Sequence, residues 1–126
     1  MISLVIADDQ PAVREGLRMR LSIEADMQIV GEAQNGVEAL EVTTHLHPNI
    51  VLMDLEMPHM DGLAATRALQ SLAPECCVIL LTIHDDETTR KRAREVGAAG
   101  FVSKHADDSV LLDAIRALAG RLENKD

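Results

Sequence analysis

The sequence predicts a doubly wound α/β fold, a (βα)5 sandwich in which helices cover both faces of a parallel five-stranded sheet. Short apolar runs alternate along the chain with longer segments whose apolar residues recur at helical spacing. The strand-like runs are apolar at consecutive positions, which is typical of parallel strands buried on both faces. Since right-handed crossovers leave few topologies, we expect the strand order 2-1-3-4-5, with ligands at the carboxyl ends of the strands.

The N-terminal segment predicts a strand followed by a helix. Residues Ile2–Ala7 form a short apolar run that ends in two aspartates. A helix is expected from Pro11 to about Ala25, because proline suits the first helical turn and Val13, Leu17 and Leu21 recur every four residues.

The second strand and helix follow the same alternation. The strand is expected over Gln28–Ala33, and an Asn-Gly turn leads into a helix over Val37–Leu46. In this helix Val37 and Leu40 are expected to face the core, with Leu46 as a third candidate. A Pro-Asn pair then stops the helix.

The middle of the chain supplies the third and fourth pairs. The apolar run Ile50–Met53 predicts the third strand, and the segment Gly62–Leu72 predicts the third helix. The apolar run Val78–Leu81 predicts the fourth strand. A fourth helix is expected over Glu87–Val96, where Gly97 closes it.

The last pair is a short strand over Gly100–Ser103 and a helix from Asp108 to about Leu118. In this helix Leu111, Ile115 and Leu118 form a single apolar stripe, which predicts one buried face.

Length and composition indicate one compact domain, with 126 residues of which 47% are hydrophobic. We expect residues 1–119 to form this domain and residues 120–126 to begin a linker or to be a free tail. The net charge of −9 argues against this segment binding a nucleic-acid backbone itself. No apolar run approaches the roughly 20 residues that span a bilayer, and no signal peptide is evident. Adjacent Cys76 and Cys77 cannot form a disulfide framework, which favours the cytoplasm.

Reactive or polar side chains follow four of the predicted strands. Asp8 and Asp9 follow the first strand, Asp54 the third, Thr82 the fourth and Lys104 the fifth. Because these ends meet at one edge of the sheet, three mutually repelling carboxylates should lie together and require compensation. Mg²⁺ prefers such oxygen ligands, and Lys104 adds a positive charge. A nucleophilic carboxylate, a metal and counter-charges are the components that phosphoryl transfer needs.

Nearly the whole chain resembles the receiver domain of bacterial two-component response regulators, a family of flavodoxin-like fold. The resemblance is most specific in the segment from Asp54 to Gly62. The segments that carry the resemblance are LVIADD (Leu4 to Asp9), AQNGVEAL (Ala33 to Leu40), IVLMDLEMPHMDG (Ile50 to Gly62), ILLT (Ile79 to Thr82) and GAAGFVSK (Gly97 to Lys104).

The resemblance implies roles for individual residues. Asp54 matches the aspartate that is phosphorylated, and Asp8 and Asp9 match those that help to hold Mg²⁺. Glu56 matches the residue whose backbone carbonyl is a further metal ligand. Thr82 and Lys104 match residues that contact the phosphoryl group. Thr82 and Phe101 match switch residues, although the position of Phe101 fits a plain core residue equally well.

The segments AQNGVEAL and GAAGFVSK are most similar to the NarL/FixJ group, in which a LuxR-type helix-turn-helix domain that binds promoters follows the receiver. The resemblance implies a sensor histidine kinase as phosphodonor, a homodimer on phosphorylation, and DNA binding through a C-terminal domain. The alternative is a stand-alone receiver that acts through protein contacts or in a phosphorelay.

Two other functional classes compete with the switch. One is an interaction module of the same fold that is not phosphorylated, against which the intact Asp54, Thr82 and Lys104 argue. The other is an enzyme. Phosphohydrolases that form an aspartyl-phosphate carry a D-x-D-x-T motif, in which an acid/base aspartate stands two residues after the nucleophile. Here Glu56 holds that position and leads into a loop that contains proline, and no cap domain fits within 126 residues. We therefore expect a switch and not a turnover enzyme.

Overall fold

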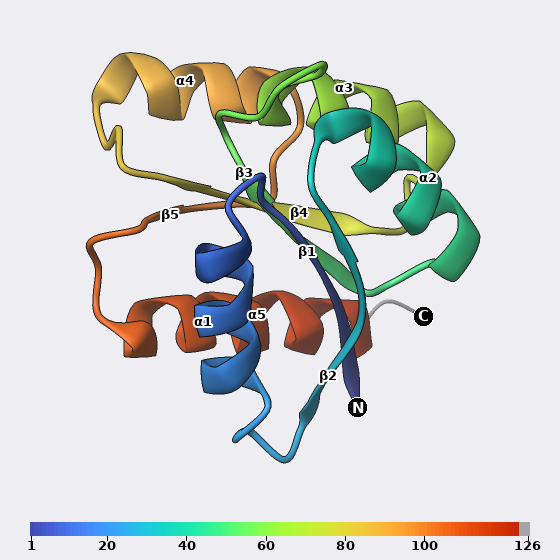
Figure 1. The fold of residues 1–126 in the computed structure, drawn as a ribbon, viewed down its shortest axis with the longest axis vertical. Coiled ribbons are helices and arrows are strands. Elements are labelled where there is room, and N and C mark those ends of the chain that lie inside the picture. The colour runs from blue at the N-terminus through green and yellow to red at the C-terminus, as the bar shows by residue number, and fades with distance from the viewer. Residues whose placement is uncertain (124–126) are drawn as a thin grey trace.

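A computed structural model describes residues 1–123, within which five strands alternate with five helices (Figure 1). All strand pairs are parallel, and the order β2-β1-β3-β4-β5 confirms the predicted topology. The strands are β1 (Ile2–Ala7), β2 (Met27–Ala33), β3 (Ile50–Asp54), β4 (Cys77–Thr82) and β5 (Gly100–Ser103). The helices are α1 (Pro11–Leu21), α2 (Gly36–Leu46), α3 (Gly62–Leu72), α4 (Glu87–Glu95) and α5 (Asp108–Glu123).

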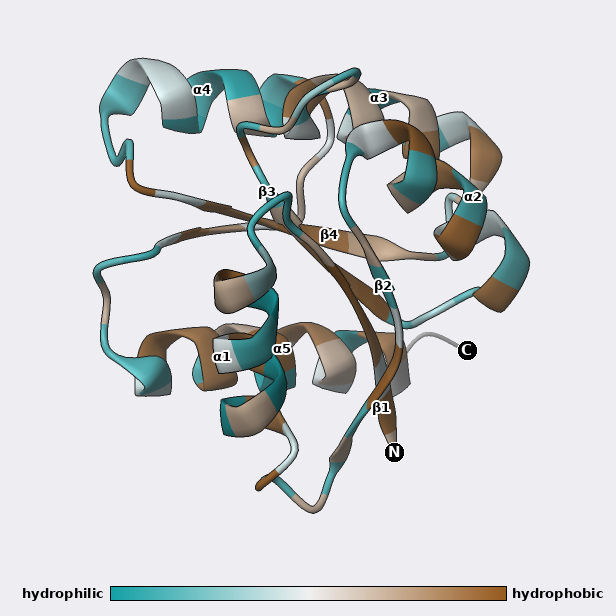
Figure 2. Ribbon diagram, viewed as in Figure 1, coloured by the Kyte–Doolittle hydropathy of each residue, from teal (hydrophilic) through white to brown (hydrophobic). Residues whose placement is uncertain are grey.

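The sheet separates two hydrophobic clusters, because successive strand residues point to opposite faces. Helices α1 and α5 cover one face, and α2, α3 and α4 cover the other (Figure 1). On β1, Leu4 and Ile6 pack toward α1 and α5, whereas Val5 and Ala7 pack toward the other helices. The central strands are the most hydrophobic part of the ribbon in Figure 2. This rigid sheet holds the strand ends in fixed positions.

Helices α1 and α5 end several residues away from their predicted ends, whereas α2 and α4 differ from the prediction by one residue. Helix α1 ends at Leu21 and not near Ala25, because after the C-cap Ser22 the hydrogen bonds change to those of turns: the N–H of Glu24 donates to the Leu21 carbonyl and the N–H of Met27 to the Glu24 carbonyl. The residues after the cap form the turn into β2. Helix α5 continues past Leu118 to Glu123. Helical structure therefore extends into the range 120–126, of which residues 124–126 lie outside the described part.

The predicted inward face of α2 is wrong in part. Val37 and Leu46 are each 43% exposed, and the fully buried positions are Ala39 and Thr43. Helix α2 starts at Gly36, which approaches the loop before α3 so closely that a Cβ would lie 2.3 Å from a backbone oxygen. Small residues on the inner face permit this close packing, and a search for large apolar residues overlooks them.

Among the described residues, no helix combines the length and the apolar character that crossing a bilayer requires.

Thr43 and Thr66 allow a matched stability test. Both are 0% exposed, but Thr66 Oγ1 donates to the Gly62 carbonyl at 2.7 Å, whereas Thr43 Oγ1 has no partner within residues 1–123. A buried hydroxyl without a partner costs about 1–3 kcal/mol, so Thr43→Val should raise the free energy of unfolding by about 1 kcal/mol. Thr66→Val should lower it by a similar amount. Urea unfolding of both variants tests this, and equal losses would contradict it.

Candidate functional site

Three carboxylates lie together where β1 and β3 end. Asp8 and Asp9 follow β1, and Asp54 is the last residue of β3. One ligand atom from each lies within 4.8 Å of the others. The sheet causes this convergence, because β1 and β3 are parallel neighbours. Asp8 and Asp54 are only 1% and 7% exposed, whereas Asp9 is exposed.

The ammonium group of Lys104 lies between two of these carboxylates. Its Nζ is 3.0 Å from Asp8 Oδ2 and 2.9 Å from Asp54 Oδ1. Lys104 follows β5, and its backbone N–H donates to the Thr82 carbonyl at 2.8 Å, which fixes the start of the loop. One ammonium group balances only part of the charge of three carboxylates. The site therefore keeps an excess of negative charge.

Burial and charge shift the pKa values of this group in a consistent way. Burial raises the pKa of Asp54, the charge of Asp8 adds to this, and the hydrogen bond from Lys104 opposes it. Burial disfavours the Lys104 ammonium, but hydrogen bonds to Asp54 and Asp8 outweigh it, so the pKa of Lys104 is raised. Hard oxygen donors with excess negative charge suit a divalent cation such as Mg²⁺. A bound cation would offset both the burial of the Asp54 carboxylate and its repulsion by Asp8.

Thr82 and the loop after β3 complete the site. The Thr82 hydroxyl oxygen is buried and accepts the N–H of His84 at 2.9 Å, and a hydroxyl in this role can still donate its hydrogen. The backbone N–H of Glu56 also acts on the Asp54 carboxyl, where it lowers the pKa against the larger effect of burial. An open depression is lined by Asp9, Gln10, Val13, Asp54, Glu56, Met57, Pro58, Thr82, Ile83 and Lys104.

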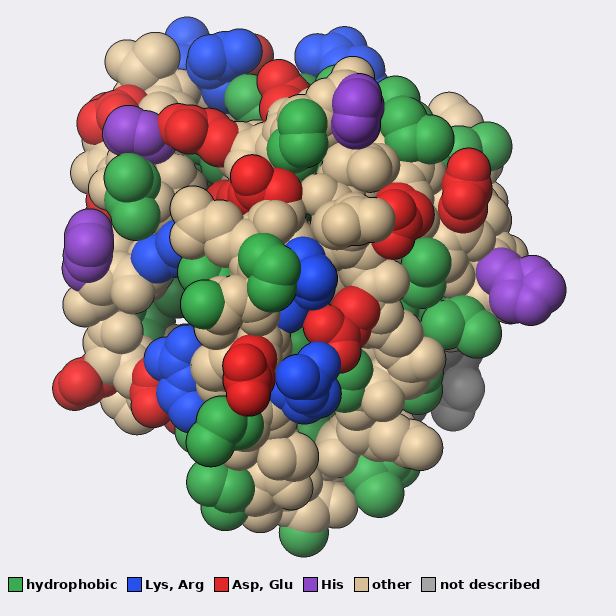
Figure 3. Space-filling view, viewed as in Figure 1, with side chains coloured by type: hydrophobic (Ala, Val, Ile, Leu, Met, Phe, Trp, Pro, Cys, Tyr) green, Lys and Arg blue, Asp and Glu red, His purple; other side chains and the backbone are tan. Residues whose placement is uncertain are grey.

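Glu56, in the lining of this depression, contacts His84. His84 Nε2 lies 2.6 Å from Glu56 Oε1, and Ile83 beside them is 56% exposed. In the space-filling view acidic side chains gather above α1 and below α4, while Lys and Arg side chains follow the upper edge along α4 (Figure 3). The lining of the depression itself is mainly acidic, with Asp9, Asp54 and Glu56 beside the cation Lys104.

Phe101 stands apart from the other residues that the sequence indicated. It is half-buried on β5 against the cluster under α2, α3 and α4, and it does not line the depression. The guanidinium carbon of Arg90 lies 4.8 Å from the centre of its ring, and Arg90 Nε lies 2.6 Å from Asp85 Oδ1. Its contact is therefore with helix α4, and Arg90 and Asp85 are contacts that the sequence did not reveal.

A model of the family described as the response regulator receiver domain matches residues 4–116 of the chain. The chain belongs to this family. The transcriptional regulatory protein DegU of Brevibacillus brevis is 35% identical over 94% of this receiver domain and 50% of its own length. The oxygen regulatory protein NreC of Staphylococcus aureus is 40% identical, and the match covers 93% of this chain and 54% of the length of NreC. The receiver thus spans about half the length of these curated relatives.

Solved structures agree with this assignment. A LuxR-family two-component response regulator from Aurantimonas superposes on the receiver with a TM-score of 0.89 and 34% identity, over 94% of this chain and 85% of that one. The signal receiver domain of the response regulator NarL from Mycobacterium tuberculosis has a TM-score of 0.86 and 31% identity, over 98% of both chains. The relatives of this receiver are of the NarL and LuxR type, as the sequence indicated.

The raised pKa of Asp54 predicts how the stability of the metal-free receiver depends on pH. A carboxyl whose pKa is higher in the folded state stabilises the fold fully only below its unfolded value, near 3.8, and loses that contribution as pH rises through the folded value. In EDTA, Asp54→Asn should therefore be more stable than the parent at neutral pH, and the difference should shrink toward pH 3.8. Chemical unfolding across this range measures it, and a difference that grows toward acid would contradict it.

Proposed function

We propose that the chain is the phosphoacceptor switch of a two-component response regulator, with Asp54 as the residue that takes the phosphoryl group. One observation carries the proposal: Lys104 Nζ contacts both Asp54 and Asp8 inside a cluster of carboxylates that favours a divalent cation. Asp8, Asp9, Asp54 and the backbone carbonyl of Glu56 would hold Mg²⁺.

Each side chain has a distinct part in the transfer. The Asp54 carboxylate attacks phosphorus, a new P–O bond forms, and the bond to the donor breaks, with the electron pair leaving on the donor atom. Lys104 and the Thr82 hydroxyl face the same space and would pair with phosphoryl oxygens. Bound Mg²⁺ would supply further neutralisation of those oxygens. The depression is open, which admits a donor side chain from a sensor histidine kinase.

Intact-mass measurement tests the proposal. With Mg²⁺ and acetyl phosphate the chain should gain the mass of one phosphoryl group, and excess EDTA should prevent the gain. An equal mass gain with and without EDTA would contradict a metal-dependent site. Steady turnover of a phosphate ester, without accumulation of the labelled form, would support a phosphohydrolase in place of a switch.

The output that we propose is transcription regulation, through a DNA-binding domain outside this chain. The curated relatives are named as transcriptional or oxygen regulatory proteins, and this receiver covers about half of their length. We propose residues 1–119 as the receiver and residues 120–126, into which helix α5 continues as far as Glu123, as the start of a linker or a free tail. We propose the cytoplasm as the place of the signalling step, which the two free cysteines, Cys76 and Cys77, support. The alternative is a stand-alone receiver that acts by protein contact or in a phosphorelay.

Phosphorylation should shift the chain from monomer toward homodimer. A phosphoryl group on Asp54 can draw the Thr82 hydroxyl toward it through a charge-assisted hydrogen bond. Thr82 lies directly beside Ser103 in the β4–β5 pair, and Phe101 on the same strand contacts Arg90 of α4. Sedimentation velocity with and without beryllofluoride measures the shift, and an unchanged mass would leave release of an output domain as the consequence of phosphorylation.

A further inference from the structure

We infer that Arg14 is a positioning residue for the metal site, because it holds the peptide that carries Asp9. Arg14 is on α1, and its Nη1 donates to the backbone carbonyl of Asp8 at 2.5 Å. Its Nε lies 3.3 Å from Glu32 Oε1 on β2. The inference rests on the proposed function, since it assumes that Asp9 is a metal ligand.

The peptide unit between Asp8 and Asp9 is planar, so fixing its carbonyl oxygen also fixes the N–H and Cα of Asp9. The Asp8 carboxylate has its own restraints, since Oδ1 accepts the N–H of Gln10 and Oδ2 accepts Lys104. Asp9 is exposed, and within residues 1–123 no hydrogen bond or ion pair holds its carboxylate. The direction of the Asp9 side chain therefore depends on the backbone that Arg14 holds.

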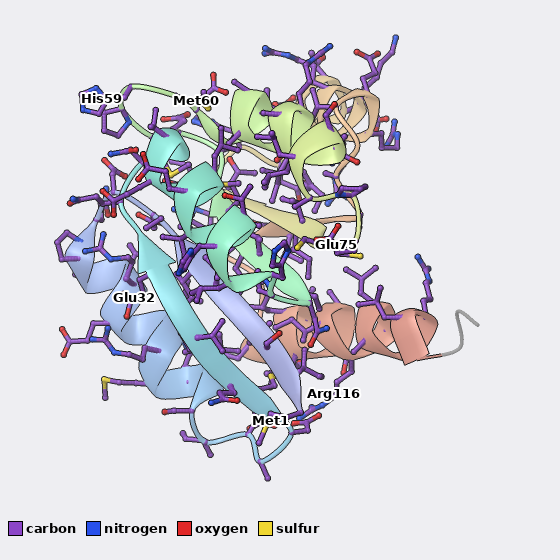
Figure 4. All side chains as sticks on the ribbon, turned by 90° about the vertical axis from the view of Figure 1, so that its right-hand side faces the viewer. Met1, Glu32, His59, Met60, Glu75 and Arg116 are labelled. Carbon is purple, nitrogen blue, oxygen red and sulfur yellow. The ribbon has the colours of Figure 1, made fainter. Side chains whose placement is uncertain are left out.

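Glu32 keeps Arg14 in this position. Glu32 lies on β2 on the side of α1 (Figure 4), and it is the register partner of Ile6 on β1. The side chains of Arg14 and Glu32 are only 18% and 28% exposed, which limits their freedom to leave the contact. A donor held by a second residue restrains a neighbouring ligand, as outer-shell partners of metal ligands do.

Arg18 provides a matched control one turn further along α1. Arg18 Nη1 lies 2.5 Å from Oε2 of Glu32, the oxygen that Arg14 does not contact. The Arg18 side chain is 48% exposed. No contact of Arg18 with Asp8 or Asp9 occurs within residues 1–123. Arg14→Met and Arg18→Met therefore remove the same charge from the same ion-pair group, and only Arg14→Met releases the Asp8 carbonyl.

The sign of the effect separates positioning from simple electrostatics. Removing a positive charge near a cation site should strengthen Mg²⁺ binding if charge alone matters. Positioning predicts the opposite for Arg14→Met, with the Mg²⁺ dissociation constant raised about tenfold. Arg18→Met should bind Mg²⁺ as the parent does or slightly more tightly. Arg14→Lys keeps a charged donor and should recover part of the loss.

Calorimetric titration with MgCl2, beside thermal unfolding in EDTA, tests the inference without any phosphodonor. We expect Arg14→Met to lose affinity while its metal-free melting temperature stays close to that of Arg18→Met. Equal dissociation constants for these two variants, or tighter binding by Arg14→Met, would overturn the inference. If Arg14→Met does not fold, the comparison of Arg14→Lys with Arg18→Lys decides in the same way. A parent that binds no Mg²⁺ would instead reject the proposed function.

Discussion

Asp54→Asn and Asp54→Ala are expected to accept no phosphoryl group, with labelling by acetyl phosphate and Mg²⁺ reduced to background. The reason is chemical, since the amide and the methyl group have no carboxylate oxygen that can attack phosphorus. Of the three clustered carboxylates, Asp54 lines the depression and also contacts Lys104, whose Nζ lies 2.9 Å from Asp54 Oδ1, with Thr82 in the same lining. Asp8 is 1% exposed, and its carboxylate oxygens are occupied by Gln10 and Lys104.

Asp113→Asn is the matched control, because Asp113 is an exposed aspartate on α5 away from the depression. It should label as the parent does. Intact mass and peptide mapping measure both variants. Persistent labelling of Asp54→Ala, with the phosphoryl group mapped to Asp9, would move the acceptor to the neighbouring carboxylate and contradict the assignment.

The strand ends could be predicted from the sequence because the buried strands are unambiguous apolar runs. The run Ile50–Met53 places Asp54 at the carboxyl edge of the sheet, and the structure extends β3 by that one residue. The same rule brings Asp8, Asp9 and Lys104 to this edge, and the distances within the group agree with it.

It was harder to predict which face of a helix is buried and where the helix ends, because both depend on small and polar residues that an apolar pattern does not include. The fully buried positions of α2 are Ala39 and Thr43, whereas the larger Val37 is 43% exposed. Helix α5 passes the last residue of its apolar stripe, Leu118, and continues to Glu123 without a stop signal in the sequence.

Contacts between side chains of distant elements could not be predicted from spacing. Arg14 bonds a backbone carbonyl, and its partner Glu32 belongs to a strand that the fold brings beside α1. Arg90 reaches Phe101 only because β5 passes under α4. Such contacts depend on side-chain reach across the folded surface, which no local pattern records.

Gly62→Ala is expected to destabilise the fold by about 3 kcal/mol, at the upper end of the usual range for overpacking. Gly62 is the first residue of α3, and a Cβ there would lie 2.2 Å from the backbone oxygen of Asp54 and 3.0 Å from Leu55 Cα. Those atoms cannot give way easily, because β3 is paired on both sides, with β1 and β4.

Helix α3 would therefore have to move, which strains the hydrogen bond from the Gly62 N–H to the Leu55 carbonyl at 2.8 Å. It also strains the cap in which Asp61 Oδ1 accepts the N–H of Ala64. Since the contact is with the carbonyl of Asp54 itself, the same change should displace the proposed acceptor. Gly62→Ala should thus lose phosphoryl uptake even under conditions where most of it remains folded.

Gly120→Ala is the control, because Gly120 lies in α5 and a Cβ there meets nothing within 4 Å. Replacing an unhindered helical glycine should stabilise the chain by up to about 1 kcal/mol, since alanine loses less backbone entropy on folding. Urea unfolding in EDTA compares the two variants. A free energy of unfolding for Gly62→Ala within about 0.5 kcal/mol of the parent, the usual scatter of surface substitutions, would mean that α3 shifts at little cost. The close approach of α3 to β3 would then not explain the glycine at the end of the segment DLEMPHMDG.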